Sequence, residues 1–388
     1  MITITIFSIL PTIVCAVLVL LLALDLYHNY SRPRAILCIF MLVTTLLYTG
    51  HFFYFNHLTT AIPLTDSIYS FCNPAVYPLY FIYIEELTGY RNNRRRQLLY
   101  LLPSLLCFLT VSLLYCLMNA DETDVFIEKY LYGGEISALT GYAWWQAVAH
   151  MAVRLVFGVQ IPFVFFKGWK KISEFNEEIG KNYSSTDGKI LSTLKPLLLA
   201  FVIVSVISFL SNIIGREHFF DSSELILPSL TFSLLLLFIG YEGLHQKFTA
   251  QDMVLDMMPC EEVNEDKIAE EYTGSQLLNN IIRVVDEEKL YLQPNLKIND
   301  LAKRLCTNRE YVYRAINIEM GQSFADFINC KRIEYATHLL EQSSDILLTE
   351  VALKSGFSST SAFYRNWKLF RHCSPRKYLN KGDKGTIL

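Results

Sequence analysis

Polar and basic side chains recur at one helical spacing in two stretches near the C-terminus. The first set is Arg309, Glu310, Tyr313, Arg314 and Asn317, and the second is Thr360, Ser361, Tyr364, Arg365 and Lys368. Residues three or four positions apart share a face of a helix. Arginine, asparagine, serine and threonine contact base edges in the major groove of DNA or hold its phosphates. A solvated charged face is the alternative interpretation of either set.

The two sets belong to an internal repeat. Residues 301–308 align with residues 351–358, and residues 323–329 align with residues 374–380. Between these blocks Arg314 aligns with Arg365. Two copies of one unit predict two similar helical modules.

Each copy predicts a helix, a tight turn and a second helix. Buried positions of the first helices are expected at Leu301, Ala302, Leu305, Val351 and Ala352. Gly356 serves the turn of the second copy, and Asn308 and the serines and threonine of residues 358–361 supply N-caps for the next helices. Those helices pack inward through Val312, Ile316, Phe363 and Trp367. A further helix over residues 323–340 is expected to join the copies and pack against both.

Residues 276–381 resemble the AraC/XylS family of bacterial transcription factors. The matching positions are the Leu-Ala, Leu305 and Asn308 pattern of residues 301–308, Gly321, Ser323, Phe324, Arg332, Ala336, Leu339, Leu340, Val351, Ala352, Gly356, Phe357, Phe363, Tyr364, Arg365, Lys368, Ser374, Pro375 and Tyr378. The resemblance implies two helix-turn-helix units in successive major grooves of DNA. Cys306 stands where the family favours glycine, and a positive φ there would strain the turn. His372 stands where the first copy has Gly321, and Trp367 replaces the usual phenylalanine.

The composition divides the 388 residues into unlike parts. The chain is 52% hydrophobic and 18% charged, against about 25% charged in an ordinary soluble protein. Most of the deficit lies in residues 1–247. Residues 248–274 are strongly acidic, and residues 275–388 are basic. We therefore expect a membrane domain, an acidic linker and a DNA-binding domain over these three ranges, which excludes a single soluble domain and a secreted disulfide scaffold.

Seven apolar segments are candidates for membrane spans, each about as long as a bilayer core requires. They are residues 2–24, 35–55, 67–84, 98–118, 143–166, 196–214 and 225–243. Lysines and arginines concentrate in the loops after the first, third and fifth segments. Because such loops face the cytosol, we expect the N-terminus outside and the C-terminal domain in the cytosol.

Arg154 and His150, on the fifth segment, are the candidate signal site. An intramembrane charge is costly and marks a functional position by default. Its counter-ion would be a ligand anion or an acidic residue such as Glu242 or Asp25. The alternatives are a structural ion pair, or an arginine whose head reaches the interface.

The overall prediction is an all-α protein: a seven-helix transmembrane bundle followed by a cytosolic double helix-turn-helix domain. Its expected function is sequence-specific binding of double-stranded DNA, controlled from the bacterial cytoplasmic membrane by a small molecule or a membrane signal. No cofactor, metal site or catalytic activity is expected, and homodimer formation is left open. Two alternatives remain: a transporter or membrane enzyme with a regulatory tail, and a tail that binds a protein. We expect the signal to pass from the membrane bundle to the DNA-binding domain through the seventh span and the linker.

Overall fold

The computed structural model describes residues 2–89, 93–186, 188–214, 225–246, 248–257, 274–342 and 346–382. These residues form helices with short connections, so the all-α prediction is confirmed. The chain divides into two compact units. The first comprises Met1–Ser173 and Leu191–Ala250, and the second comprises Glu174–Ile190 and Gln251–Leu388.

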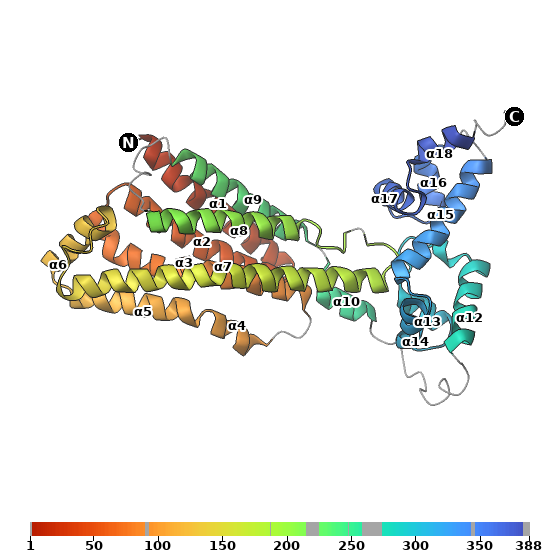
Figure 1. Cartoon of the computed structure of the whole chain (residues 1–388), viewed down its shortest axis with the longest axis horizontal. Coiled ribbons are helices and arrows are strands. Elements are labelled where there is room, and N and C mark those ends of the chain that lie inside the picture. The colour runs from red at the N-terminus through yellow and green to blue at the C-terminus, as the bar shows by residue number, and fades with distance from the viewer. Residues whose placement is uncertain are drawn as a thin grey trace. The chain divides into compact units, whose positions relative to one another are not determined.

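The first unit consists of long apolar helices joined by several short ones (Figure 1). They are α1 (Ile2–His28), α2 (Arg32–Phe55), η1 (Thr59–Ala61), α3 (Ile62–Thr88), α4 (Arg94–Tyr100), α5 (Leu102–Leu117), α6 (Ala120–Val125), η2 (Phe126–Tyr132), most of α7 (Gly141–Asn182), α8 (Leu194–Ile214) and α9 (Ile226–His245). Large apolar side chains cover their outer faces. Leu155 and Val159 on α7 are 68% and 70% exposed. Such faces suit lipid rather than water.

Within the described residues, five helices are long and apolar enough to cross a membrane: α1, α2, α7, α8 and α9. The pair α4 and α5 makes a sixth if these two helices, bent by 41°, count as one span. By length and apolarity the described residues therefore support five or six spans, and not clearly the seven that the sequence predicts. The predicted third span falls on α3, which does not meet the same criterion.

Helix α3 falls short because tyrosines, serines, Asn73 and two prolines dilute its apolar residues, even in the uncharged stretch between Asp66 and Glu85. Glu85 and Glu86 are buried near its C-terminal end. Arg32 contacts Glu86 at 3.0 Å, and Lys171 lies 3.6 Å from Glu85. Gln97 also donates to Glu86 at 2.6 Å. Since α3 is mostly buried among its neighbours, its side chains face protein rather than lipid and need not be apolar.

The second unit is built from short helices. They are α10 (Ala250–Met257), α12 (Gly274–Glu287), η4 (Leu290–Leu292), α13 (Ile298–Arg304), α14 (Arg309–Tyr313), η5 (Arg314–Glu319), α15 (Phe324–Gln342), α16 (Leu348–Lys354), α17 (Thr360–Arg371) and α18 (Pro375–Gly382). The last turns of α7, from Glu174, also belong to this unit. Most of the acidic linker, residues 258–273, lies outside the described residues. The predicted domain limits stay predictions.

Two hydrophobic cores share α15, which lies between the two helix groups in Figure 1. The first core joins α12, α13 and η5 to the start of α15 through Phe324, Phe327 and Ile328. The second joins α16 and α17 to its later turns through Ile333, Ala336 and Leu340. The prediction of one helix that packs against both copies is confirmed. So is the inward packing of Val312, Ile316, Phe363 and Trp367, since each is fully buried.

The turns of the two copies share a left-handed backbone. After the first helix of each copy, Cys306 has φ 48° and Gly356 has φ 79°. After the second helix, Gly321 has φ 68° and His372 has φ 54°. The strain expected at Cys306 is therefore present, because left-handed backbone is costly for residues other than glycine. A Cβ on Gly356 would also lie 2.6 Å from the carbonyl oxygen of Tyr291.

We expect Gly356→Ala to destabilise the second unit more than Gly321→Ala. Both replacements strain a left-handed backbone, at about 1 kcal/mol or more. Only Gly356→Ala also forces a Cβ against backbone atoms, because open space surrounds Gly321. Hydrogen exchange of the amides of α16 and α17 in the full chain measures this difference. Equal protection in the two variants would contradict it.

Candidate nucleic-acid interface

Helix α17 presents most of the second predicted set on an exposed face. The Ser359 hydroxyl caps the helix by accepting from the Ala362 amide at 3.0 Å. Phe363 and Trp367 anchor its inner side in the second core. Exposed side chains then follow at Ser361, Tyr364, Arg365 and Lys368, with Thr360 half-buried. This face carries two cations and two hydroxyls within about three helical turns.

The first predicted set lies on α14 and η5. Asn308 caps α14 by accepting from the Glu310 amide at 3.1 Å. Glu310 and Arg314 are exposed. Tyr313 is half-buried and packs against the first core. The Asn317 amide, also half-buried, donates to the Tyr313 carbonyl at 3.2 Å.

Arg309 differs from the other predicted contact residues because α7 engages it. Its Nη2 donates to the Asn182 Oδ1 at 2.7 Å, and its Nε donates to the same oxygen at 3.1 Å. Glu178 Oε1 lies 3.5 Å from Nη2. The last turns of α7 therefore offer this guanidinium the kind of oxygen ligands that a phosphate would offer.

The chain after α7 continues through the second unit as an extended segment. Tyr183 forms an antiparallel bridge with Lys297. The Ser184 amide and hydroxyl both donate to the Leu296 carbonyl, at 3.1 and 2.7 Å. The Ser185 hydroxyl lies 2.8 Å from that of Ser358, in the turn before α17. One short segment thus contacts both helix-turn-helix copies.

Arg332, in the middle of α15, is the buried centre of these contacts, with only 1% of its surface exposed. Its guanidinium donates to the Tyr291 carbonyl at 2.7 Å and to the Gln293 carbonyl at 2.6 Å. It also donates to the Ser184 hydroxyl at 3.1 Å and carbonyl at 3.3 Å. Its Cζ lies 5.6 Å from the centre of the Phe357 ring. Burial lowers the pKa of Arg332 to about 10, so the charge persists at neutral pH.

Helix α10 closes the same region from the start of the linker. The Asp256 carboxylate accepts from the Tyr183 hydroxyl at 3.0 Å and from Lys297 Nζ at 2.7 Å. The Asn299 amide donates to the Asp256 carbonyl at 2.9 Å. Burial and the nearby Asp256 raise the pKa of the Tyr183 phenol, which keeps it a hydrogen-bond donor.

Sequence reasoning did not anticipate the contacts of residues 174–190. Only their lysines were used, as evidence of topology. Arg332 was a matching position of the family resemblance, without an assigned role. An arginine at a buried position of a predicted helix requires several hydrogen-bond acceptors. The sequence could therefore have predicted that Arg332 has buried partners, but it could not have identified Ser184 as one of them.

Of the two candidate signal residues, His150 lies in a polar group inside the first unit. His150 Nε2 is 2.8 Å from Asp66 Oδ2, and Nδ1 is 2.8 Å from the Gln146 carbonyl. The Tyr115 hydroxyl donates to the same Asp66 oxygen at 2.7 Å. Arg154 is half-buried, with its Cζ 5.9 Å from the centre of the Tyr130 ring.

The two acidic residues suggested for Arg154 have other contacts. Asp25 accepts from Arg34 at 2.7 Å, and Glu242 accepts from the Thr193 hydroxyl at 2.7 Å. The acidic side chain nearest to the predicted site residues in the described contacts is Asp66, which binds His150.

Comparison with known proteins gives the C-terminal part a family. Residues 301–381 match the family described as a helix-turn-helix domain. Uncharacterized HTH-type transcriptional regulators of Staphylococcus aureus strains MSSA476 and N315 are each 29% identical over 118 residues. The Msm operon regulatory protein of Streptococcus mutans is 30% identical over 84 residues. The chain carries a C-terminal AraC-type helix-turn-helix domain.

The similarity covers part of each protein. The aligned segment is 30% of this chain and 15% of each staphylococcal relative. For the streptococcal relative it is 22% of this chain and 30% of that protein. No solved structure matches the chain.

We expect Arg332→Met to destabilise the second unit severely. Methionine fills similar space but leaves the carbonyls of Tyr291 and Gln293 and the groups of Ser184 without their donor. Each buried acceptor left without a donor costs about 1–3 kcal/mol, so a loss of more than about 3 kcal/mol is expected. Lys303→Met, at an exposed site, is the control. Thermal unfolding of both variants in detergent tests this, and equal midpoints would contradict it.

Proposed function

We propose that this chain is a membrane-tethered transcription regulator whose C-terminal domain binds specific DNA sequences under control of the membrane unit. The observation that carries the proposal is one chain that combines long apolar helices with two helix-turn-helix copies. Both copies expose polar and basic faces. The helix-turn-helix match over residues 301–381 supports DNA as the partner.

The proposed topology has seven crossings, with the N-terminus outside and the C-terminal domain in the bacterial cytosol. Helix α3 would be the crossing that the apolarity criterion misses, because its neighbours surround it. The distribution of lysine and arginine among the loops supports this orientation. Arg32 and Lys171 meet Glu86 and Glu85 beside the C-terminal end of α3, where a cytosolic interface is expected.

The proposed DNA contacts follow the two exposed faces. Ser361, Tyr364, Arg365 and Lys368, with Thr360, would enter one major groove. Arg314 and Glu310, with Tyr313 and Asn317 at the edge, would enter the next. Arginine recognises guanine by two hydrogen bonds, and glutamate accepts from cytosine. Helix α15, shared by both cores, would set the spacing between the two copies.

Arg314→Ala and Arg365→Ala are each expected to weaken specific DNA binding by the full chain. Where the arginine reads a guanine, the loss is roughly 1–3 kcal/mol with relaxed preference at one base pair. Lys303→Ala, an exposed cation outside both faces, is the control. Selection of bound genomic fragments, followed by titration at several salt concentrations, measures both effects. Unchanged affinity and preference in both variants would reject the proposed faces.

We propose that the membrane unit controls DNA binding through α7 as well as through the linker. Helix α7 belongs to the first unit up to Ser173 and to the second unit from Glu174. Near its end, Asn182 and Glu178 hold Arg309. Arg309 cannot give the same donors to a phosphate and to α7 at once. We therefore propose that the α7 contact and the DNA contact of Arg309 compete.

The double variant Glu178→Ala, Asn182→Ala is expected to bind DNA more tightly, by roughly ten- to hundredfold, the range of one charge-assisted hydrogen bond. Glu177→Ala is the matched control, since it also removes one negative charge but its carboxylate pairs with Lys181. In an Arg309→Ala background the gain should vanish. A gain that persists there would show that Arg309 does not mediate the effect.

His150 and Arg154 remain the proposed signal-sensing residues of α7. Their support is a buried polar group that includes Asp66 and Tyr115. A ligand or membrane state would have to bind the two arrangements of the bundle with different affinity. The resulting change in the arrangement of the bundle would then be passed along α7 to its contact with Arg309.

A further inference from the structure

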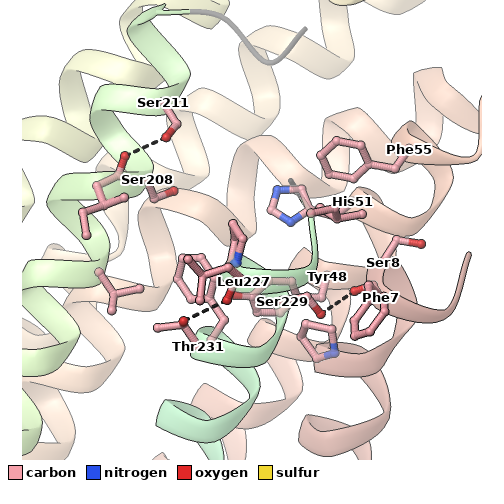
Figure 2. Close-up of a pocket in the computed structure, with 16 residues that line it drawn as sticks. Phe7, Ser8, Tyr48, His51, Phe55, Ser208, Ser211, Leu227, Ser229 and Thr231 are labelled. Carbon is pink, nitrogen blue, oxygen red and sulfur yellow. Dashed lines mark hydrogen bonds between the residues drawn. The ribbon is translucent and has the colours of Figure 1, made fainter. Parts of the chain in front are cut away.

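A cavity of about 220 Å³ lies within the first unit, away from the proposed sensing residues of α7. Residues of α1, α2, α8 and α9 line it, and Figure 2 shows their side chains around it. Its volume exceeds the roughly 150 Å³ of an apolar protein cavity that holds benzene. A compact molecule somewhat larger than one benzene ring therefore fits.

No charged side chain occurs among the sixteen lining residues that belong to the described part of the chain. Its walls are apolar except for an imidazole and several hydroxyls. An ionised ligand would lose its water and gain no opposite charge, which is strongly unfavourable. The lining therefore selects an uncharged ligand.

Three hydroxyls of the lining are available to a ligand as hydrogen-bond acceptors. Ser229 donates to the Phe7 carbonyl at 2.5 Å, Ser211 to Ile207 at 3.0 Å, and Thr231 to Leu227 at 2.8 Å. Dashed lines mark these bonds beside the labelled Ser211, Ser229 and Thr231 in Figure 2. Each hydroxyl hydrogen is used, while the oxygen retains lone pairs. A ligand with a hydrogen-bond donor complements such oxygens.

One wall of the cavity is a continuous row of rings. Phe232 and Tyr48 have ring centres 5.8 Å apart, Tyr48 and His51 5.4 Å, and His51 and Phe55 6.1 Å. These spacings are those of ring–ring contacts. A flat aromatic ligand would extend the row, whereas a flexible alkyl chain would lose more conformational freedom on binding.

We propose that this cavity binds a small uncharged aromatic molecule with one hydrogen-bond donor, of the size of an indole. The proposal goes beyond the proposed function, because it adds to the membrane unit a ligand site separate from His150 and Arg154. Its regulatory consequence rests on that function, but the binding itself does not.

The first test measures saturable binding of radiolabelled indole to the full chain in phospholipid vesicles, with protein-free vesicles as the blank. Three competitors of similar size separate the arguments. Benzofuran lacks the donor and should compete roughly two- to tenfold less well, the range of one hydrogen bond. 1-Octanol keeps a donor but has no ring and should compete less well than indole. Indole-3-acetate is charged and should not compete.

Failure would be visible in the same data. Indole uptake no greater than in protein-free vesicles would remove the site. Equal competition by 1-octanol would overturn the aromatic assignment and favour an alkyl or lipid chain as the occupant. Competition by indole-3-acetate would contradict the argument from the uncharged lining.

Variants locate the binding. Ser208→Phe should fill part of the cavity and weaken indole binding by roughly tenfold or more, because overpacking excludes the ligand. Val206→Phe, on the same helix but outside the lining, should bind as the wild type does. If Ser208→Phe does not fold, Ser211→Phe provides the same test. Unchanged binding in a folded filling variant would reject this location.

The regulatory consequence has its own readout. Indole should change the affinity of the vesicle-bound chain for its selected DNA, and Ser208→Phe should abolish that change. Binding without any effect on DNA affinity would reject regulation through the cavity and keep the site. If the wild-type chain in vesicles binds no DNA sequence specifically, the proposed function is rejected. The result on indole binding is unaffected by that outcome. Arg154→Ala should leave indole binding unaltered, because Arg154 does not line the cavity.

Discussion

The second unit depends on how one buried cation is satisfied. Arg332 loses its water on folding, and this loss is unfavourable unless nearly every N–H finds an acceptor. The acceptors come from η4 and the residue after it, from Asn329 on α15 itself, and from Ser184, which is distant in sequence. The ring of Phe357 adds a face from the second copy. The guanidinium therefore ties together parts that have separate hydrophobic cores.

Local patterns predicted the parts of the fold that local patterns control. The repeat placed Leu301, Val351 and their neighbours in first helices, and Asn308 at an N-cap, because apolar spacing and capping depend on nearby residues. The left-handed turn at Cys306 could be suspected from the position of glycine in the second copy. The exposed faces of α14 and α17 followed from the same periodicity.

Contacts between residues distant in the sequence could not be predicted from such patterns. A helix that faces lipid must be apolar, whereas α3 is buried among other helices and need not be. A count of spans based on apolarity therefore misses it. Residues 182–185 have the composition of an ordinary polar loop, whether water or a protein core surrounds them. Arg309 illustrates the same limit. Its type and position predicted a surface contact, while the structure pairs it with Asn182 and Glu178.

The position of Ser184 has a consequence for how such proteins can diverge. A domain whose buried polar groups all find partners within the domain can be exchanged between chains by recombination at a linker. Here the segment 174–190, which lies between two membrane helices in the sequence, supplies acceptors to the interior of the helix-turn-helix unit. A recombination junction near residue 274 would transfer Arg332 without Ser184. The two stretches are therefore constrained to change together, and a foreign DNA-binding tail grafted onto this membrane unit would arrive with an unmatched buried charge.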